Sequence, residues 1–125
     1  MLNQKKMFTK ILSFLGVEDV TDKITFTSAW TEQWKVAFRF GNVVFFSFEA
    51  YADTVQAGAQ YTIANISSDL KPKRTLPFTG HTATASFVPN GIVNAWVWAD
   101  KTITIRLSNA NGNYVYVDGW FEVDV

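Results

Sequence analysis

Apolar and polar residues alternate along most of this chain, and a period of two predicts β-strands with one face in a core. In residues 93–99 the odd positions are small and apolar, whereas the even positions include Trp96 and Trp98. In residues 114–123 the odd positions are mostly apolar, and the even positions are Tyr114, Tyr116, Asp118, Trp120 and Glu122. If the aliphatic faces form the core, a second face displays aromatic side chains beside carboxylates. Such a face is expected to contact a sister subunit or a sugar.

Further strands are predicted for residues 24–30, 34–40, 61–66, 82–88 and 102–107. Residues 43–48 are apolar on both faces, so this strand is expected to be central or covered on both sides. Residues 67–81 hold two of the three prolines and predict a long loop, while Pro89-Asn90-Gly91 predicts a turn. Together these patterns predict an all-β fold: an antiparallel β-sandwich or jelly roll of about eight strands.

The N-terminal residues follow a different period. Phe8, Ile11, Leu12 and Leu15 recur at helical spacing, and Gly16 is suited to end a helix. The chain is therefore divided into a short amphipathic helix with an acidic connector, residues 1–22, and a β-sandwich head domain, residues 23–125. The helix is expected either to lie on the sandwich or to form a short bundle around a molecular three-fold axis.

Composition narrows the class of protein. Charged residues make up only 18% of the 125 residues, and eleven basic side chains balance eleven acidic ones. No basic field exists to attract a phosphate backbone, so nucleic-acid binding is not expected. The absence of cysteine excludes disulfides and thiolate zinc sites and fits folding in a reducing cytoplasm. No apolar run is long enough to predict membrane insertion.

Candidate chemistry is sparse. His81 is the only histidine, and no serine lies in a Gly-x-Ser-x-Gly turn, so nothing indicates a nucleophile with its base. Asp118 and Glu122 share a strand face but are four residues apart, too far to act alone as a hydrolytic pair. One histidine does not build a transition-metal site. The sequence therefore predicts a protein that is not an enzyme and that holds no cofactor or metal.

The aromatic residues then carry the functional interpretation, because tyrosine and tryptophan offer apolar faces with a polar edge to a sugar or to another subunit. Trp34 shares a face with Val36 and Phe38 and is predicted to be core. Residues near loops are predicted to bind saccharide: Trp98, Asp100, His81, Asn111 and Asn113. Residues predicted to form a subunit interface are Phe8, Ile11, Leu15, Trp96, Tyr114, Tyr116 and Trp120.

Three segments resemble bacteriophage tail-fibre and baseplate proteins. Residues 34–48, Trp-Lys-Val-Ala-Phe-Arg-Phe-Gly-Asn-Val-Val-Phe-Phe-Ser-Phe, are similar to a strand that leads through Gly-Asn-Val-Val into a second hydrophobic strand. Residues 66–78 are similar to the leucine, Lys-Pro and phenylalanine loop of those proteins, and Pro89 to Ile92 is similar to their next turn. The resemblance covers about residues 24 to 123. It implies the β-sandwich head domain of a phage or prophage receptor-binding protein.

Such heads are usually homotrimers that bind host saccharides, and trimerisation gives avidity to weak sites. The leading expectation is thus a non-enzymatic head that binds a host cell-wall or surface saccharide. It would fold in the bacterial cytoplasm and then join other tail or baseplate proteins in the virion. One alternative is a purely structural trimeric virion protein. Another is a carbohydrate-binding module of a cellular protein, which predicts a monomer.

Overall fold

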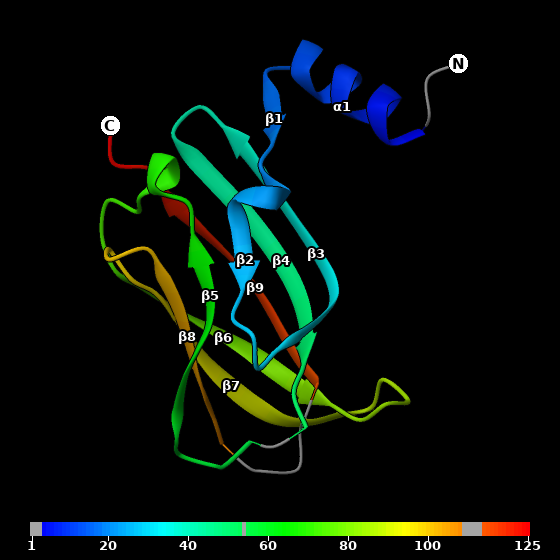
Figure 1. Ribbon diagram of the computed structural model, residues 1–125, viewed down its shortest axis with the longest axis vertical. Coiled ribbons are helices and arrows are strands. Elements are labelled where there is room, and N and C mark those ends of the chain that lie inside the picture. The colour runs from blue at the N-terminus through cyan, green and yellow to red at the C-terminus, as the bar shows by residue number, and fades with distance from the viewer. Residues whose placement is uncertain (1–3, 54, 109–113) are drawn as a thin grey trace.

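The computed structural model describes residues 4–53, 55–108 and 114–125, apart from the side chains of five residues in the N-terminal helix. The chain is mostly β-structure (Figure 1). In chain order the elements are α1 (Gln4–Phe14), β1 (Val17–Asp19), η1 (Thr21–Lys23), β2 (Ile24–Phe26), β3 (Thr31–Phe40), β4 (Val43–Tyr51), β5 (Gln60–Ile66), η2 (Ser68–Leu70), β6 (Leu76–Ala83), β7 (Pro89–Val97), β8 (Thr102–Leu107) and β9 (Tyr114–Glu122).

All nine strands belong to one sheet, whose pairs are antiparallel and whose order is β1-β3-β4-β9-β6-β7-β8-β5-β2. The sheet curls into a half-barrel. The expected all-β, antiparallel class is confirmed. The expected division into two face-to-face sheets is not confirmed, because continuous ladders join every strand. Both edge strands, β1 and β2, have three residues, and short edges limit pairing with other chains.

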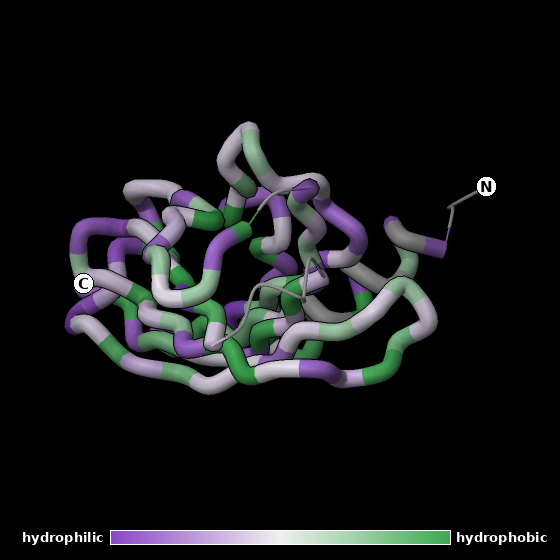
Figure 2. The backbone as a smooth tube through the Cα atoms, turned by 90° about the horizontal axis from the view of Figure 1, so that it is seen from below, coloured by the Kyte–Doolittle hydropathy of each residue, from purple (hydrophilic) through white to green (hydrophobic). Residues whose placement is uncertain are grey.

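The concave side of the curl holds the hydrophobic core, and Figure 2 shows the chain curling around this interior. The alternation seen in the sequence decides which side chains enter it. Val93, Ala95 and Val97 of β7 are fully buried, and so are Val115 and Val117 of β9. The prediction that the odd positions of these two strands form the core is confirmed. The even positions consequently point to the outer face.

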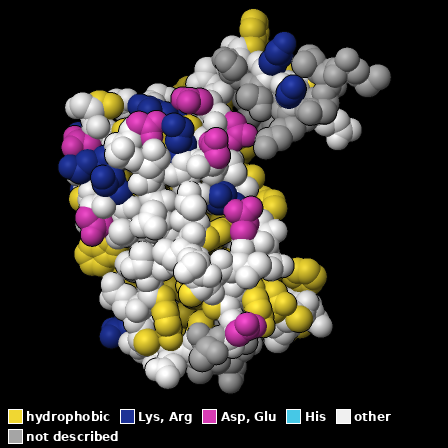
Figure 3. All heavy atoms as spheres, viewed as in Figure 1, with side chains coloured by type: hydrophobic (Ala, Val, Ile, Leu, Met, Phe, Trp, Pro, Cys, Tyr) yellow, Lys and Arg dark blue, Asp and Glu magenta, His cyan; other side chains and the backbone are white. Residues whose placement is uncertain are grey.

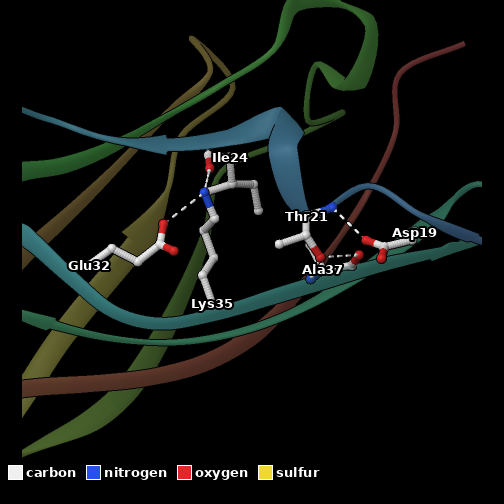
Figure 4. A network of polar contacts seen from close by, with 6 residues as sticks. All are labelled: Asp19, Thr21, Ile24, Glu32, Lys35 and Ala37. Atoms are coloured by element: carbon white, nitrogen blue, oxygen red, sulfur yellow. Dashed lines mark hydrogen bonds and ion pairs between the residues drawn. The ribbon is translucent and has the colours of Figure 1, made fainter. Parts of the chain in front are cut away.

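Side chains close the gap where the curl brings β2 and η1 near β3 (Figure 4). The Thr21 hydroxyl accepts a hydrogen bond from Ala37 N at 3.0 Å. Lys35 Nζ donates to the Ile24 carbonyl at 2.5 Å and forms an ion pair with Glu32 at 3.1 Å. The contacts of Thr21 and Ile24 join η1 and β2 to β3, with which neither is paired in the sheet, and the Lys35–Glu32 pair lies within β3. We call this group of five residues the seam.

Several boundaries differ from the sequence-based prediction, and the strand predicted for residues 82–88 keeps only residues 82 and 83, within β6. The predicted loop 67–81 contains most of β6, and the predicted turn at Pro89 is the start of β7. The turn lies instead at residues 84–88, where Phe87 N donates to Thr84 O and Phe87 has a φ of 65°. Pro77 fits inside β6 because this strand pairs with β9 only over His81–Ala83, so its first half has a free edge that tolerates a proline.

The N-terminal strand and helix complete the fold. The acidic connector of the sequence analysis contains β1, which pairs with the end of β3 from Val17 opposite Phe40 to Asp19 opposite Phe38. The helix α1 packs against β1 and stands off from the sheet (Figure 1). Across the described residues, no helix combines the length and apolar character that a membrane span requires.

Candidate functional site

The outer face of the sheet carries a row of paired side chains that crosses five strands. Trp34 on β3 lies opposite Glu49 on β4, and Glu49 lies opposite Tyr116 on β9. Tyr116 lies opposite His81 on β6, and His81 lies opposite Ile92 on β7. Directly opposed residues point to the same side of a sheet, so aromatic, acidic and imidazole groups line up on one surface. The prediction of aromatic side chains beside carboxylates on the second face is confirmed.

One core prediction on this face is wrong. Trp34 is 52% exposed, because Ala37 and the other inward positions of β3 have the opposite parity. The strand over residues 43–48 was expected to be central or covered on both sides, and β4 is central, between β3 and β9, but its outer face is open and Phe45 is 53% exposed. In a run of apolar residues, parity does not tell which of the two faces is the buried one. The curl of the whole sheet decides it.

A shallow groove opens on the outer face between β6 and β7. Two cross-strand pairs form it: Pro77 opposite Trp96, and Thr79 opposite Asn94. Phe78 and Ala95, the residues between them, complete the lining of a space of about 420 Å³. Pro77, Thr79 and Asn94 are exposed, and Trp96 is half-buried. The groove therefore combines an indole and a pyrrolidine ring with an amide and a hydroxyl, without a charged side chain among its lining residues.

Trp98 supports this groove from one end. Its ring lies 6.4 Å from that of Trp96, with 30° between the two planes. The Trp98 indole Nε1–H donates to the Thr104 hydroxyl at 2.6 Å, which fixes the ring. Asp100, predicted to bind saccharide, instead holds the β7–β8 turn. Its Oδ1 accepts hydrogen bonds from Thr102 N at 3.1 Å and from the Thr102 hydroxyl at 2.6 Å.

His81 and Tyr116 form a second feature of the outer face. Their rings are stacked with centroids 4.8 Å apart and planes 6° apart. The Tyr116 hydroxyl is buried beside Glu49 but makes no hydrogen bond of standard geometry with any described residue. Burial, and secondarily the Glu49 carboxylate, raise the pKa of Tyr116 to about 12. Tyr116 therefore stays neutral at physiological pH. Its ring packs against the imidazole of His81.

The predicted saccharide-binding residues are not brought together. His81 lies four residues along β6 from Pro77, which is about 13 Å at the rise of a strand, while Trp98 and Asp100 lie at the opposite end of the groove. Asn111 and Asn113 lie outside the described residues. The sequence did not identify Pro77, Thr79 and Asn94 as site residues. It predicted a loop at Pro77 and Thr79, and only the register of β6 with β7 brings all three residues beside Trp96.

The residues predicted to form a subunit interface differ in exposure and in the residues that they contact. Tyr114 packs on Tyr51 with ring centroids 4.8 Å apart, and Trp120 is exposed. Ile11 of α1 and Leu15, which directly follows α1, are exposed, whereas the side chain of Phe8 lies outside the described part of the structure. Trp96 lines the groove. No partner chain tests the interface prediction itself, which stays a prediction.

Binding is the chemistry that this face supports. No group of three or more His, Cys, Asp or Glu side chains able to hold a metal occurs within the described residues. The groove has no titratable side chain in its lining. An aromatic wall beside amide and hydroxyl groups suits a ligand with both apolar C–H faces and hydroxyls.

Comparison with known proteins adds no relative: no protein-family model matches the chain, and no curated protein sequence matches it.

Proposed function

We propose that this protein is a non-enzymatic saccharide-binding head of a phage tail or baseplate and that a sugar ring binds in the groove between β6 and β7. The observation that supports the binding site most is that two cross-strand pairs, Pro77 with Trp96 and Thr79 with Asn94, surround one open space. The phage context rests on the sequence resemblance. The same resemblance supports a sandwich-like head and a homotrimer that acts at the host cell surface.

The groove has the functional groups that sugar recognition requires. The indole of Trp96 can stack on the C–H face of a pyranose, and Pro77 provides an apolar wall opposite. The Asn94 amide both donates and accepts hydrogen bonds, and the Thr79 hydroxyl does the same. Because all four residues lie on paired strands, little conformational entropy is lost when the ligand binds.

A neutral lining favours an uncharged sugar. Charged side chains on neighbouring strands form hydrogen bonds outside the groove. Arg106 lies opposite Asn94 and donates from Nε to Gly58 O at 2.8 Å. Asp118 accepts a hydrogen bond from the Ser47 hydroxyl. A shallow single site of this kind binds weakly, and several sites in a homotrimer would hold a cell by avidity.

A polysaccharide array tests the proposal. Purified bacterial surface polysaccharides are immobilised, and wild type is compared with Asn94→Ala and Trp96→Ala. We expect wild type to bind at least one neutral polysaccharide and both variants to lose about tenfold or more in affinity, the cost of about 1.4 kcal/mol of contacts. Phe87→Ala is the control, because Phe87 is an exposed aromatic residue at the β6–β7 turn and does not line the groove.

Three outcomes separate the alternatives. Binding that survives both groove variants would contradict the proposed site. No binding to any polysaccharide would favour a purely structural virion protein. Specific binding by a protein that is monomeric in solution would favour a carbohydrate-binding module over the trimeric head.

A further inference from the structure

The outer face of β3, β4 and β9 is covered with exposed aromatic side chains. Trp34, Phe40, Phe45 and Trp120 are between 41% and 60% exposed. Phe45 lies directly opposite Trp120. These four side chains, with Glu49 and Asp118 on the same face, are here called the aromatic-acidic face. The four aromatic residues expose roughly 400 Å² if a whole aromatic side chain presents 150–250 Å², which is comparable to the largest apolar patch of a typical monomer, and such patches often have a function.

The helix α1 presents a complementary surface. Met7, Ile11, Phe14 and Leu15 follow the helical spacing of one face, and their side chains are from 49% to 91% exposed. The helix contains three lysines and no acidic residue. Figure 3 shows α1 protruding from the body of the molecule, with lysine side chains on its surface. A basic amphipathic helix thus stands beside a sheet whose aromatic-acidic face carries the carboxylates of Glu49 and Asp118.

The two surfaces also match in size. Three neighbouring strands span about 10 Å, and an α-helix with its side chains is about 10–12 Å wide. The face from Trp34 to Phe40 extends about 20 Å along β3, and the eleven residues of α1 extend about 16 Å. One helix therefore covers the face. One such contact buries roughly 400 Å² on the face and a similar area on the helix, and a copy in a closed ring makes two such contacts, so each copy buries roughly 800 Å² over both.

We propose that α1 of one copy docks on the aromatic-acidic face of a second copy of this chain. Met7, Ile11 and Phe14 would contact the aromatic side chains, and Lys10, which borders this side of the helix, would lie near Glu49 and Asp118. Such a contact joins two different surfaces and generates a closed ring when the rotation between copies allows it. The proposal rests on the proposed self-association and does not depend on saccharide binding, since the groove lies on β6 and β7.

A mixing experiment distinguishes this contact from a bundle of helices. Phe14→Asp removes the helix surface, and Phe45→Asp removes the face; both side chains are exposed, so folding is preserved and is checked by circular dichroism. We expect light scattering to give wild type a multiple of the 14.1 kDa chain mass and each variant the mass of one chain. An equimolar mixture of the two variants should give a species of two chains, because one supplies an intact face and the other an intact helix.

The control and the contrary results are specific. Phe87→Asp changes a residue that is 74% exposed at the β6–β7 turn, outside both surfaces, and should leave the wild-type mass unchanged. A wild-type monomer would overturn self-association and this contact together, while leaving the array result to decide saccharide binding. An oligomer that is lost in Phe14→Asp but kept in Phe45→Asp would overturn only the helix-on-face contact, and so would variants that do not combine.

Discussion

At the scale of single residues, Gly80 leaves no room for a side chain. A Cβ added there would lie 2.1 Å from the carbonyl oxygen of Tyr116 on β9. The clash is with backbone, so no side chain can move aside. We expect Gly80→Ala to lower the free energy of unfolding by about 3 kcal/mol or more, measured by urea denaturation.

Gly41→Ala is the matched comparison. No atom lies within 4 Å of a Cβ at Gly41, but its φ of 60° is unfavourable for alanine. The cost there should be only about 1–2 kcal/mol. Equal losses for the two variants would show that backbone conformation, rather than the approach of β6 to β9, makes Gly80 necessary.

Asp69 gives a pH dependence with a definite sign. The hydrogen bond from Lys23 at 2.7 Å, and then that from Ser67, lower the pKa of Asp69 from 3.8 to about 2. The ionised carboxylate therefore stabilises the folded state above pH 3.8, and this contribution disappears as the pH falls toward 2. We expect the Tm of wild type to fall more steeply over this range than the Tm of Asp69→Asn.

The control for this prediction removes a different surface carboxylate. Asp124→Asn changes an exposed aspartate in the C-terminal segment. Its Tm should fall with acid as steeply as that of wild type. If Asp69→Asn and wild type lose the same Tm between about pH 4 and pH 2, the Lys23–Asp69 pair does not contribute.

The alternation of apolar and polar residues was the sequence pattern that predicted the buried face of a strand most reliably. Val93, Ala95 and Val97 alternate with larger or polar residues, and this pattern identified their buried face correctly. Trp34 shows where parity fails. Its strand carries aromatic residues on one face and Lys35, Ala37 and Arg39 on the other, and hydrophobicity alone favours the wrong face. Lys35 turns inward because the seam offers it a carbonyl and a carboxylate.

At the scale of elements, the seam replaces a missing strand pair. Lys35 donates to the Ile24 carbonyl, pairs with Glu32 and lies 5.7 Å from the centroid of the Phe26 ring. We expect Lys35→Met, which keeps the apolar stem, to lower the free energy of unfolding by about 2 kcal/mol, because hydrogen bonds to charged groups contribute about 1.5–3 kcal/mol. Chemical denaturation measures this loss.

Lys73→Met is the control for the seam. Lys73 forms an exposed ion pair with Glu122 at 3.7 Å, and exposed pairs contribute less than about 1 kcal/mol. A loss for Lys35→Met no larger than that for Lys73→Met would mean that the ladders alone hold the half-barrel.

Elements with strict alternation were predicted well, and elements at breaks in the pattern were not. The strand over residues 102–107 was predicted with the boundaries of β8. In contrast, the sequence predicts a loop over most of β6 because Pro77 suggests a break, and it does not predict β1 because three residues are too few to show a period. Pairing with β3 makes β1 a strand, and pairing with β7 and β9 makes β6 a strand, rather than local propensity.

At the scale of the whole molecule, the curl of one sheet creates both functional surfaces. The groove needs the register of β6 with β7, and the aromatic-acidic face needs the alignment of β3, β4 and β9. The sequence indicated an outward aromatic surface but not which strands lie side by side in it, because alternation decides the face of a residue and does not decide the strand order. The candidate saccharide site therefore lies on the sheet, and not near the loops where the sequence predicted it.

Amide NMR during titration with pooled oligosaccharides released from bacterial cell walls tests the central claim most directly, since it detects weak binding and locates it. We predict that shift changes concentrate on Thr79, Asn94 and Trp96 and that Asn94→Ala abolishes them. The absence of shift changes, or changes confined to the Asp100 turn or to the aromatic-acidic face, would contradict a saccharide site in the β6–β7 groove.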